Sequence, residues 1–278
     1  MRLPAGLLLQ GRLHREFRFG PLTGKAEMAL AECASEGGSV PVRVTSALFA
    51  TLASVGGQRP SRALVQRLFV ADRQFLMRQL AIQLGLDSLW LTPRCSRCGV
   101  AFDISVTLSA LPAKPAGPGF PYAPARTSQG TFRVHAPNGE DQEAIVNVDD
   151  PAAARRCLAG RCIVERLEDD ERRRSTGQPA VDVSALSEED LSAIDTALES
   201  VCPELAVGAR AVCPECDAVQ EVPVDPYLCL RRSPSEIYLD VHVLASAYHW
   251  SEPQILALPR SRRKRYLSLV DGDRGMAC

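Results

Sequence analysis

Helical spacing of apolar residues is the main pattern in the first third of the chain. The longest such pattern opens at Pro60 and ends at Gly85, and it indicates one amphipathic helix. Its apolar positions are Leu64, Val65, Leu68, Phe69, Phe75, Leu76, Leu80 and Ile82. A shorter helix is predicted over residues 25–36, where two glycines follow and favour a helix end. The valine-rich residues 40–44 are extended in character.

Alternating apolar and polar residues predict strands elsewhere. Every second residue of 101–108 is apolar, which is the pattern of a half-buried strand. Residues 131–134 and 218–224 are two further strand candidates. Residues 112–130 hold five prolines and three glycines, so they predict a loop or linker and exclude a helix.

Several helix starts in the second half of the chain carry capping residues. Asp150-Pro151 places a cap directly before a proline in the first helical turn. Residues 187–190 and 251–254 each resemble a capping box, in which a serine is followed three residues later by an acidic or amide side chain. A helix capped by Ser233 or Ser235 is also predicted, running through Ile237, Val241, Leu244 and Tyr248. A last helix, with a basic polar face, is predicted over 260–270.

Composition excludes several classes of protein. With 278 residues, of which 46% are hydrophobic, the chain can bury a sizeable core. A net charge of −1 gives no overall field toward nucleic acid or membrane. No run of about 18 apolar residues predicts a membrane span. The N-terminus lacks the apolar stretch of about 7–15 residues that a signal peptide needs, so we expect a cytoplasmic location.

The charge is uneven along the chain. Residues 140–199 contain 16 acidic and 7 basic residues, whereas residues 254–278 contain 6 basic and 2 acidic ones. Within the acidic part, residues 165–174 place acidic side chains four positions before arginines, which predicts an exposed helix or a solvated loop. The two segments either attract each other or face different partners.

Two pairs of cysteines carry the strongest chemical signal. In a reducing compartment, paired cysteines indicate metal ligands before disulfides. Cys95 and Cys98 form one CxxC pair, and Cys213 and Cys216 form another. A tight turn directs both sulfurs of such a pair to one ion, and two turns complete a tetrahedral shell. Because a predicted strand follows each pair, as in a zinc ribbon, we predict one structural Zn²⁺ with no open coordination position.

The spacing between the two pairs departs from a compact zinc signature. The 114 residues between Cys98 and Cys213 far exceed the usual separation of about 15–20. The middle of the chain would then be an insertion, and the alternative is two unrelated reduced pairs. The remaining internal cysteines are interpreted as buried apolar thiols: Cys33, Cys157, Cys162, Cys202 and Cys229.

No catalytic motif is present. The sequence contains no nucleophile elbow, P-loop, dinucleotide fingerprint or zinc-protease motif, so we expect neither an enzyme nor a small-molecule substrate. An enzyme would require His242 or His249 to meet Cys229 or a carboxylate in a pocket. The basic residues 260–265 can contact phosphates, and a zinc-ribbon nucleic-acid-binding protein is therefore the alternative function.

Several stretches together resemble a known family. The residues that carry the likeness are 19–24, 71–76, 132–134, 139–144, 240–245, Tyr248-His249-Trp250-Ser251-Glu252-Pro253-Gln254-Ile255-Leu256, Pro259 and 262–267. They resemble the baseplate (hub) assembly proteins of contractile phage tails of the T-even type, and their relatives in phage-tail-like contractile injection systems. The likeness covers about half of the chain, and its C-terminal part is the most specific.

The resemblance implies a non-enzymatic role in building the baseplate or the central spike complex. Its partners would be other baseplate or tail subunits, and it carries no catalytic residues to transfer. The protein would act in the cytoplasm of the producing bacterial cell or within the assembled particle. We place the partner-binding surface on Tyr248, His249, Trp250, Arg262 and Arg263.

The predicted fold is α+β and mostly helical, with helices at both ends joined by a zinc ribbon formed from two distant CxxC knuckles. Residues 1–108 would form an N-terminal helical region with the first knuckle and its strand. Residues 109–206 would form a Pro-rich linker and an acidic insertion with short helices. Residues 207–278 would add the second knuckle, its strand and the C-terminal helices, in one domain with residues 1–108.

Overall fold

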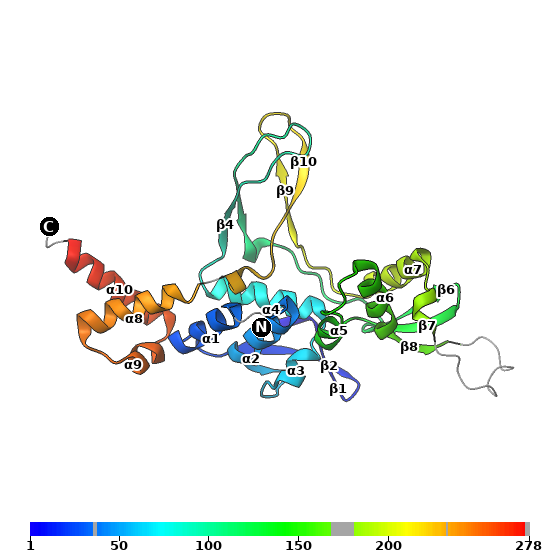
Figure 1. Cartoon of the computed structure of the whole chain (residues 1–278), viewed down its shortest axis with the longest axis horizontal. Coiled ribbons are helices and arrows are strands. Elements are labelled where there is room, and N and C mark those ends of the chain that lie inside the picture. Colours follow the sequence, from blue (N-terminus) through cyan, green and yellow to red (C-terminus); the bar gives the residue numbers. More distant parts are fainter. Residues whose placement is uncertain (36–37, 168–180, 232, 276–278) are drawn as a thin grey trace. The chain divides into compact units, whose positions relative to one another are not determined.

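Helices and strands are interspersed in the described part of the chain. The computed structural model describes residues 1–35, 38–167, 181–231 and 233–275. These residues form ten α-helices and four small antiparallel sheets (Figure 1). The predicted fold, mostly helical with helices at both ends joined by a ribbon, was therefore wrong: the protein is α/β.

The N-terminus shows why the fold prediction failed. Strands β1 (Arg2–Leu9) and β2 (Arg12–Phe19) form an antiparallel hairpin where a helical region was expected. Exposed side chains alternate with less exposed ones along β2, and this period of two marks a strand. β1 is buried on both faces from Leu3 to Leu7, so its sequence shows an apolar run without periodicity.

The chain folds into two compact units, each assembled from three segments. Unit 1 consists of Met1–Glu16, Ala63–Phe75 and Pro112–Ala206. Unit 2 consists of Phe17–Arg62, Leu76–Leu111 and Val207–Cys278.

Unit 1 is built around a sheet with the strand order β6-β7-β8. The strands are β6 (Tyr122–Thr127), β7 (Gly130–His135) and β8 (Ile163–Arg166). The helices are α5 (Gly139–Ala144), α6 (Pro151–Cys162) and α7 (Glu188–Glu199), with the 3₁₀ turn η3 (Val183–Ala185). Its largest buried apolar side chains include Phe69, Phe120, Phe132, Leu186, Leu191 and Ile194.

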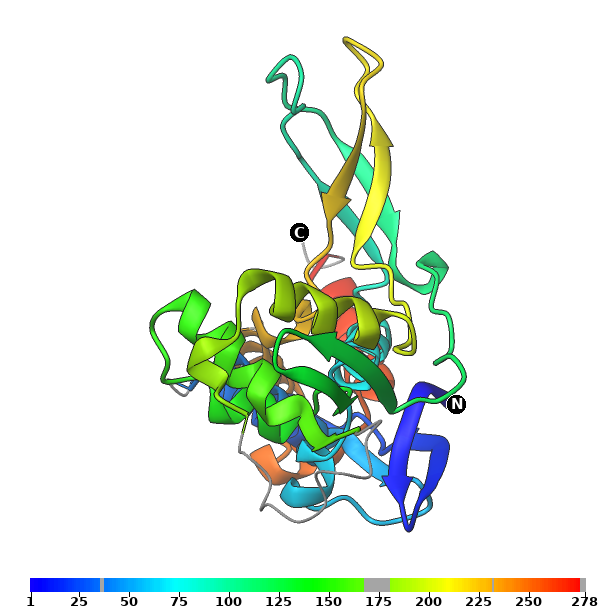
Figure 2. The same ribbon diagram turned by 90° about the vertical axis from the view of Figure 1, so that its right-hand side faces the viewer.

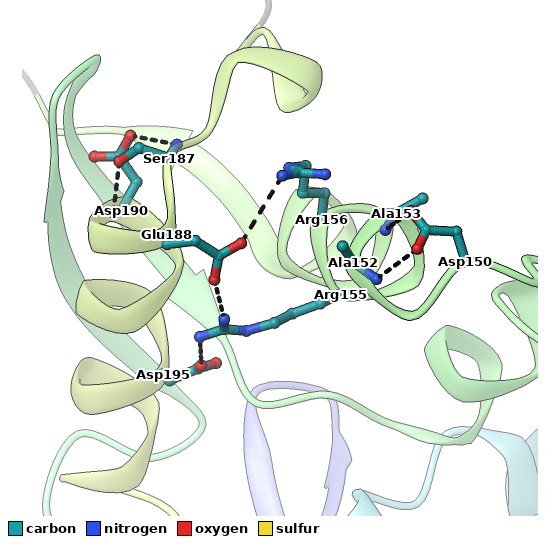
Figure 3. Close-up of polar contacts among 9 residues, drawn as sticks. All are labelled: Asp150, Ala152, Ala153, Arg155, Arg156, Ser187, Glu188, Asp190 and Asp195. Atoms are coloured by element: carbon teal, nitrogen blue, oxygen red, sulfur yellow. Dashed lines mark hydrogen bonds and ion pairs between the residues drawn. The ribbon is translucent and has the colours of Figure 1, made fainter.

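The capping residues of unit 1 act as predicted. The Asp150 carboxylate accepts hydrogen bonds from two amides at the start of α6, and Ser187 forms a capping box with Asp190 at the start of α7. Figure 3 shows Arg155 of α6 reaching two carboxylates of α7, those of Glu188 and Asp195, at 2.6 and 2.7 Å. Residues 131–134 form the predicted strand within β7.

The Pro-rich residues 112–130 contain a strand that was not predicted. Among the described residues they include no α-helix, as expected, but Tyr122–Thr127 pairs with β7. Pro124 is tolerated there because β6 lies at the edge of its sheet. One side of an edge strand has no partner strand, so a residue without an amide hydrogen can be accommodated there.

Unit 2 contains helices from both ends of the chain. They are α1 (Gly24–Ser35), α2 (Val40–Thr51), α8 (Ser235–Tyr248), α9 (Glu252–Ala257) and α10 (Arg260–Gly275), with the turn η4 (Leu228–Arg231). β3 (Leu52–Val55) pairs with the end of β2. α1, α8, α9 and α10 confirm the predicted helices, and Ser251 forms the predicted capping box with Gln254.

Two predictions in the N-terminal third need correction. Residues 40–44 are helical and not extended: Pro41 sits in the first turn of α2, where its missing amide hydrogen costs nothing. The long pattern ending at Gly85 forms two helices, α3 (Arg62–Gln66) and α4 (Val70–Gln83). In α2 tertiary burial overrides the local pattern, since the helix buries Val44, Ala47 and Leu48.

The two cysteine pairs lie on two hairpins of unit 2. β4 (Ser88–Leu91) pairs with β5 (Ile104–Thr107), followed by the turn η1 (Leu108–Ala110). β9 (Gly208–Val212) pairs with β10 (Val219–Pro223). Both views show the hairpins next to each other with their turns at the same end (Figures 1 and 2). β5 and β10 confirm the strand predicted after each cysteine pair.

Some sequence predictions fall outside the described residues. Residues 168–174 of the charged stretch and the terminal Cys278 belong to this group. A helix that crosses a bilayer needs about 20 consecutive, mainly apolar residues, and within the described ranges no helix meets that requirement.

Candidate metal centre

Each cysteine pair sits in a turn with the same backbone hydrogen bonds. The amide of Cys95 donates to the carbonyl of Val100 at 2.8 Å, and the amide of Gly99 donates to the carbonyl of Cys95 at 3.0 Å. The second turn repeats both bonds at Cys213, with distances of 2.9 and 3.0 Å. The backbone geometry therefore places the two cysteines of each turn in equivalent positions.

Both turns need a residue in the left-handed region directly after the second cysteine. Gly99 has a φ of 77° and Asp217 a φ of 56°. Glycine adopts this conformation without steric cost, and aspartate is among the few other residues that tolerate it. The CxxCG and CxxCD sequences thus encode the two turns locally.

The four sulfur atoms converge on one point. All four Sγ atoms lie within 4.8 Å of one another. Two cross-hairpin separations are 3.6 Å, from Cys95 to Cys216, and 3.7 Å, from Cys98 to Cys213. A tetrahedron with metal–sulfur bonds of about 2.3 Å has edges of about 3.8 Å, whereas a disulfide would bring two sulfurs to about 2.05 Å. This cluster can hold a metal ion, as the sequence predicted.

The hairpins pack together through a small core beside the sulfurs. Phe102, Ala211 and Val222 are buried together with Cys95 and Cys213. These apolar side chains bring residues more than a hundred positions apart into contact. The sequence spacing alone did not decide whether the two cysteine pairs meet, and this packing brings them together.

The sulfurs differ in their ease of ionisation. Amide hydrogens of Cys98 and Arg97 point at the sulfur of Cys95 and lower its pKa to about 6. The Ala218 amide favours the thiolate of Cys216, but burial and the three neighbouring cysteines raise its pKa to about 12. Four thiolates crowded together repel one another, and a bound dication removes this repulsion because its charge offsets theirs.

One residue at this site was not anticipated. Gln220 of β10 hydrogen-bonds to the backbone of the turn that carries Cys95. No local pattern marks it, because it lies within an ordinary strand and 124 residues separate it from its partner Ser96.

The aromatic residues expected to bind a partner form a cluster. Tyr248 and Trp250 stack with ring centroids 4.9 Å apart, and Tyr266 of α10 meets both rings edge-on. Between them, His249 ends α8 in the left-handed conformation, and its side chain is exposed. The three rings remain partly accessible, and their role in partner binding stays a prediction.

The two arginines expected on the same surface have different environments. Arg262 is exposed, but Arg263 has no exposed surface. The Arg263 guanidinium donates to the carboxylates of Glu27 and Asp240, both also buried. This corrects the expectation of a surface role for Arg263. Asp240 shares the buried face of α8 with Ile237 and Leu244. An acidic residue on an otherwise apolar helix face was the sequence signal for a buried basic partner.

The residues considered for an enzyme lie in different surroundings. His242 and His249 are exposed, whereas Cys229 is buried with its thiol donating to the carbonyl of Met77 at 3.7 Å.

No protein-family model, curated protein or solved structure matches this chain.

Proposed function

We propose that Cys95, Cys98, Cys213 and Cys216 bind one zinc ion as a structural centre. The observation that carries this proposal is the convergence of four sulfurs at tetrahedral separations. An all-thiolate tetrahedral shell favours zinc among the common metals. Since four protein ligands fill the shell, the ion has no position for a substrate and serves to hold the two hairpins together.

The metal assignment has a direct test. Purified protein should contain about one zinc per chain by atomic emission. Cys95→Ser or Cys213→Ser should weaken zinc binding by more than the roughly 10–100-fold typical of a change outside the coordination shell. Cys157 is exposed and outside the cluster, which corrects its interpretation as a buried thiol. Cys157→Ser is therefore the matched control and should keep full zinc content.

We further propose that the protein is a non-enzymatic scaffold or assembly component. The likeness to baseplate assembly proteins of contractile tails supports placing it in such a particle, with other baseplate or tail subunits as partners. The partly exposed cluster of Tyr248, Trp250 and Tyr266 offers a contact surface, since large aromatic side chains are enriched in interfaces.

Co-purification tests the scaffold role. The protein should be co-expressed with the products of neighbouring tail genes and isolated through an affinity tag. Stable capture of a baseplate subunit, weakened by Trp250→Ala and unchanged by Trp90→Ala, is the expected result. Trp90 is a suitable control because it is exposed on β4 and is not part of the cluster. A clean monomer that captures none of these subunits would exclude the role.

The basic helix does not favour nucleic-acid binding. Arg260, Arg263 and Lys264 each bind a carboxylate of Glu27 or Asp240 within unit 2, so two of their three charges are offset. A salt-sensitive gel shift with DNA or RNA, reduced by Arg262→Ala, would instead favour the nucleic-acid alternative.

A further inference from the structure

The side chain of Gln220 connects the two hairpins next to the metal centre. Its Oε1 accepts a hydrogen bond from the amide of Ser96 at 2.9 Å, and its Nε2 donates to the carbonyl of Arg94 at 3.1 Å. One primary amide therefore holds the backbone on both sides of Cys95. Gln220 belongs to β10 and lies four residues after Cys216.

This contact completes the support of Cys95. In an extended segment, the carbonyl before a residue and the amide after it point to the same side, so one side-chain amide can reach both. The amide and carbonyl of Cys95 itself bind Val100 and Gly99 within the first turn. The backbone at Cys95 is thus held by its own turn and by the other hairpin.

The first hairpin has no glutamine at the position that corresponds to Gln220. The equivalent position in the first hairpin, four residues after Cys98, is Phe102, which packs into the small core between the hairpins. Gln220 and Phe102 thus join the hairpins differently, one by polar contacts with the metal-binding turn and one by apolar packing.

We propose that Gln220 is a positioning residue of the metal centre, holding the first cysteine turn against the second hairpin so that the four sulfurs already face one another when the ion binds. This inference rests on the proposed metal-binding function. Groups that orient ligands without touching the metal typically change affinity by about 10–100-fold. A side chain that holds the turn in place also reduces the ordering that metal binding must otherwise impose.

Cobalt titration tests the proposal. Co²⁺ gives thiolate charge-transfer and d–d absorption bands that report a four-sulfur shell, and a competing chelator gives its dissociation constant. Gln220→Ala should raise that constant by about 10–100-fold and speed hydrogen exchange at the Ser96 amide. Glu221→Ala is the matched control. Glu221 is the next residue of β10, its side chain faces the opposite side of the strand, and Arg210 is the residue opposite it in the register of β9 and β10.

The outcomes separate this inference from the proposed function. If the parent protein gives four-sulfur cobalt bands and Gln220→Ala binds cobalt as tightly as Glu221→Ala does, the positioning role is overturned and the metal centre stands. If the parent gives no such bands, both fall. A residue that only stabilised the hairpin would change the unfolding temperature without changing the cobalt affinity of the folded protein.

Discussion

Arg263 brings a full positive charge to a position without solvent exposure, and two buried acids surround it. Its guanidinium pairs with Glu27 of α1 and, at 3.0 Å, with Asp240 of α8. Lys264 shares Asp240, and Arg260 shares Glu27. Charges removed from water are tolerated only when they are paired, so this network joins α1, α8 and α10 in one arrangement.

Replacing Arg263 should destabilise unit 2 strongly. Arg263→Ala leaves Glu27 and Asp240 buried without their central cation, which typically costs about 3–5 kcal/mol. Arg262→Ala, one residue earlier and exposed, should change stability by less than about 0.5 kcal/mol. Urea unfolding of both variants checks this, and equal midpoints for the two would contradict the structural role of Arg263.

Asp72 is a second buried charge, located in unit 1. Its two carboxylate oxygens accept hydrogen bonds from the amides of Ala5 and Gly6 at 2.8 and 2.7 Å. Burial raises the pKa of Asp72 from 3.8 to about 6, although these amides and the charge of Arg15 oppose the rise. The carboxyl group thereby ties β1 to α4.

The pKa of Asp72 predicts a pH dependence with a definite sign. Because the folded protein binds this proton more tightly than the unfolded chain, the contribution to stability is present below about pH 4 and is lost as the pH rises through 6. A difference of about two pKa units corresponds to about 3 kcal/mol. The unfolding free energies of the parent and of Asp72→Asn should both be measured in chelator. The value for the parent minus the value for Asp72→Asn should fall by about that amount between pH 4 and pH 7. A difference that is independent of pH would contradict the assignment.

At the scale of elements, Gly24 allows α1 to approach the C-terminal helices. Its amide donates to the carbonyl of Leu258 at 3.1 Å. A methyl group at this position would lie 2.9 Å from the Arg263 Nη1 and 3.0 Å from the Cα of Leu256. Since the Leu256 backbone cannot move as a flexible side chain does, only glycine fits without displacing α9.

Two glycine substitutions should therefore have opposite effects. Gly24→Ala should destabilise the protein by about 1–3 kcal/mol through overpacking. Gly272→Ala in α10 meets no atom within 4 Å and should stabilise by about 0.4–1 kcal/mol, because alanine restricts the unfolded chain. Thermal unfolding of the two variants provides the comparison, and a stabilising effect of Gly24→Ala would show that helix propensity outweighs packing at Gly24.

At the scale of the whole molecule, metal removal should affect the two hairpins that carry the cysteines more than the helices. The four cysteines and their small core belong to β4, β5, β9, β10 and the turns between them. Since metal-binding free energy contributes to folding where the ligands converge, a chelator should speed hydrogen exchange in these hairpins while the helical circular dichroism signal persists at 25 °C. Loss of that signal on chelation would mean that the ion supports the entire fold.

The units are not consecutive domains, and this affects what the sequence can reveal. The chain contributes three separate segments to each unit, and α4 and β2 contain residues of both. Local periodicity does not show which distant segments share a core. The apolar run of β1 and the prolines of 112–130 therefore appeared as loop or helical region, although both contain strands.

Local chemistry alone determined the caps, the turns and the candidate metal ligands of this protein. Ser187, Ser251 and Asp150 cap helices through bonds spanning a few residues, and each CxxC turn encodes its own geometry, so these features are readable from neighbouring residues. Only the tertiary structure decided that Cys95 and Cys213 meet, that Arg263 is buried and that Gln220 reaches Ser96. Those contacts join residues far apart in the sequence, and they depend on which apolar surfaces pack together, a property of the whole fold and not of any one segment.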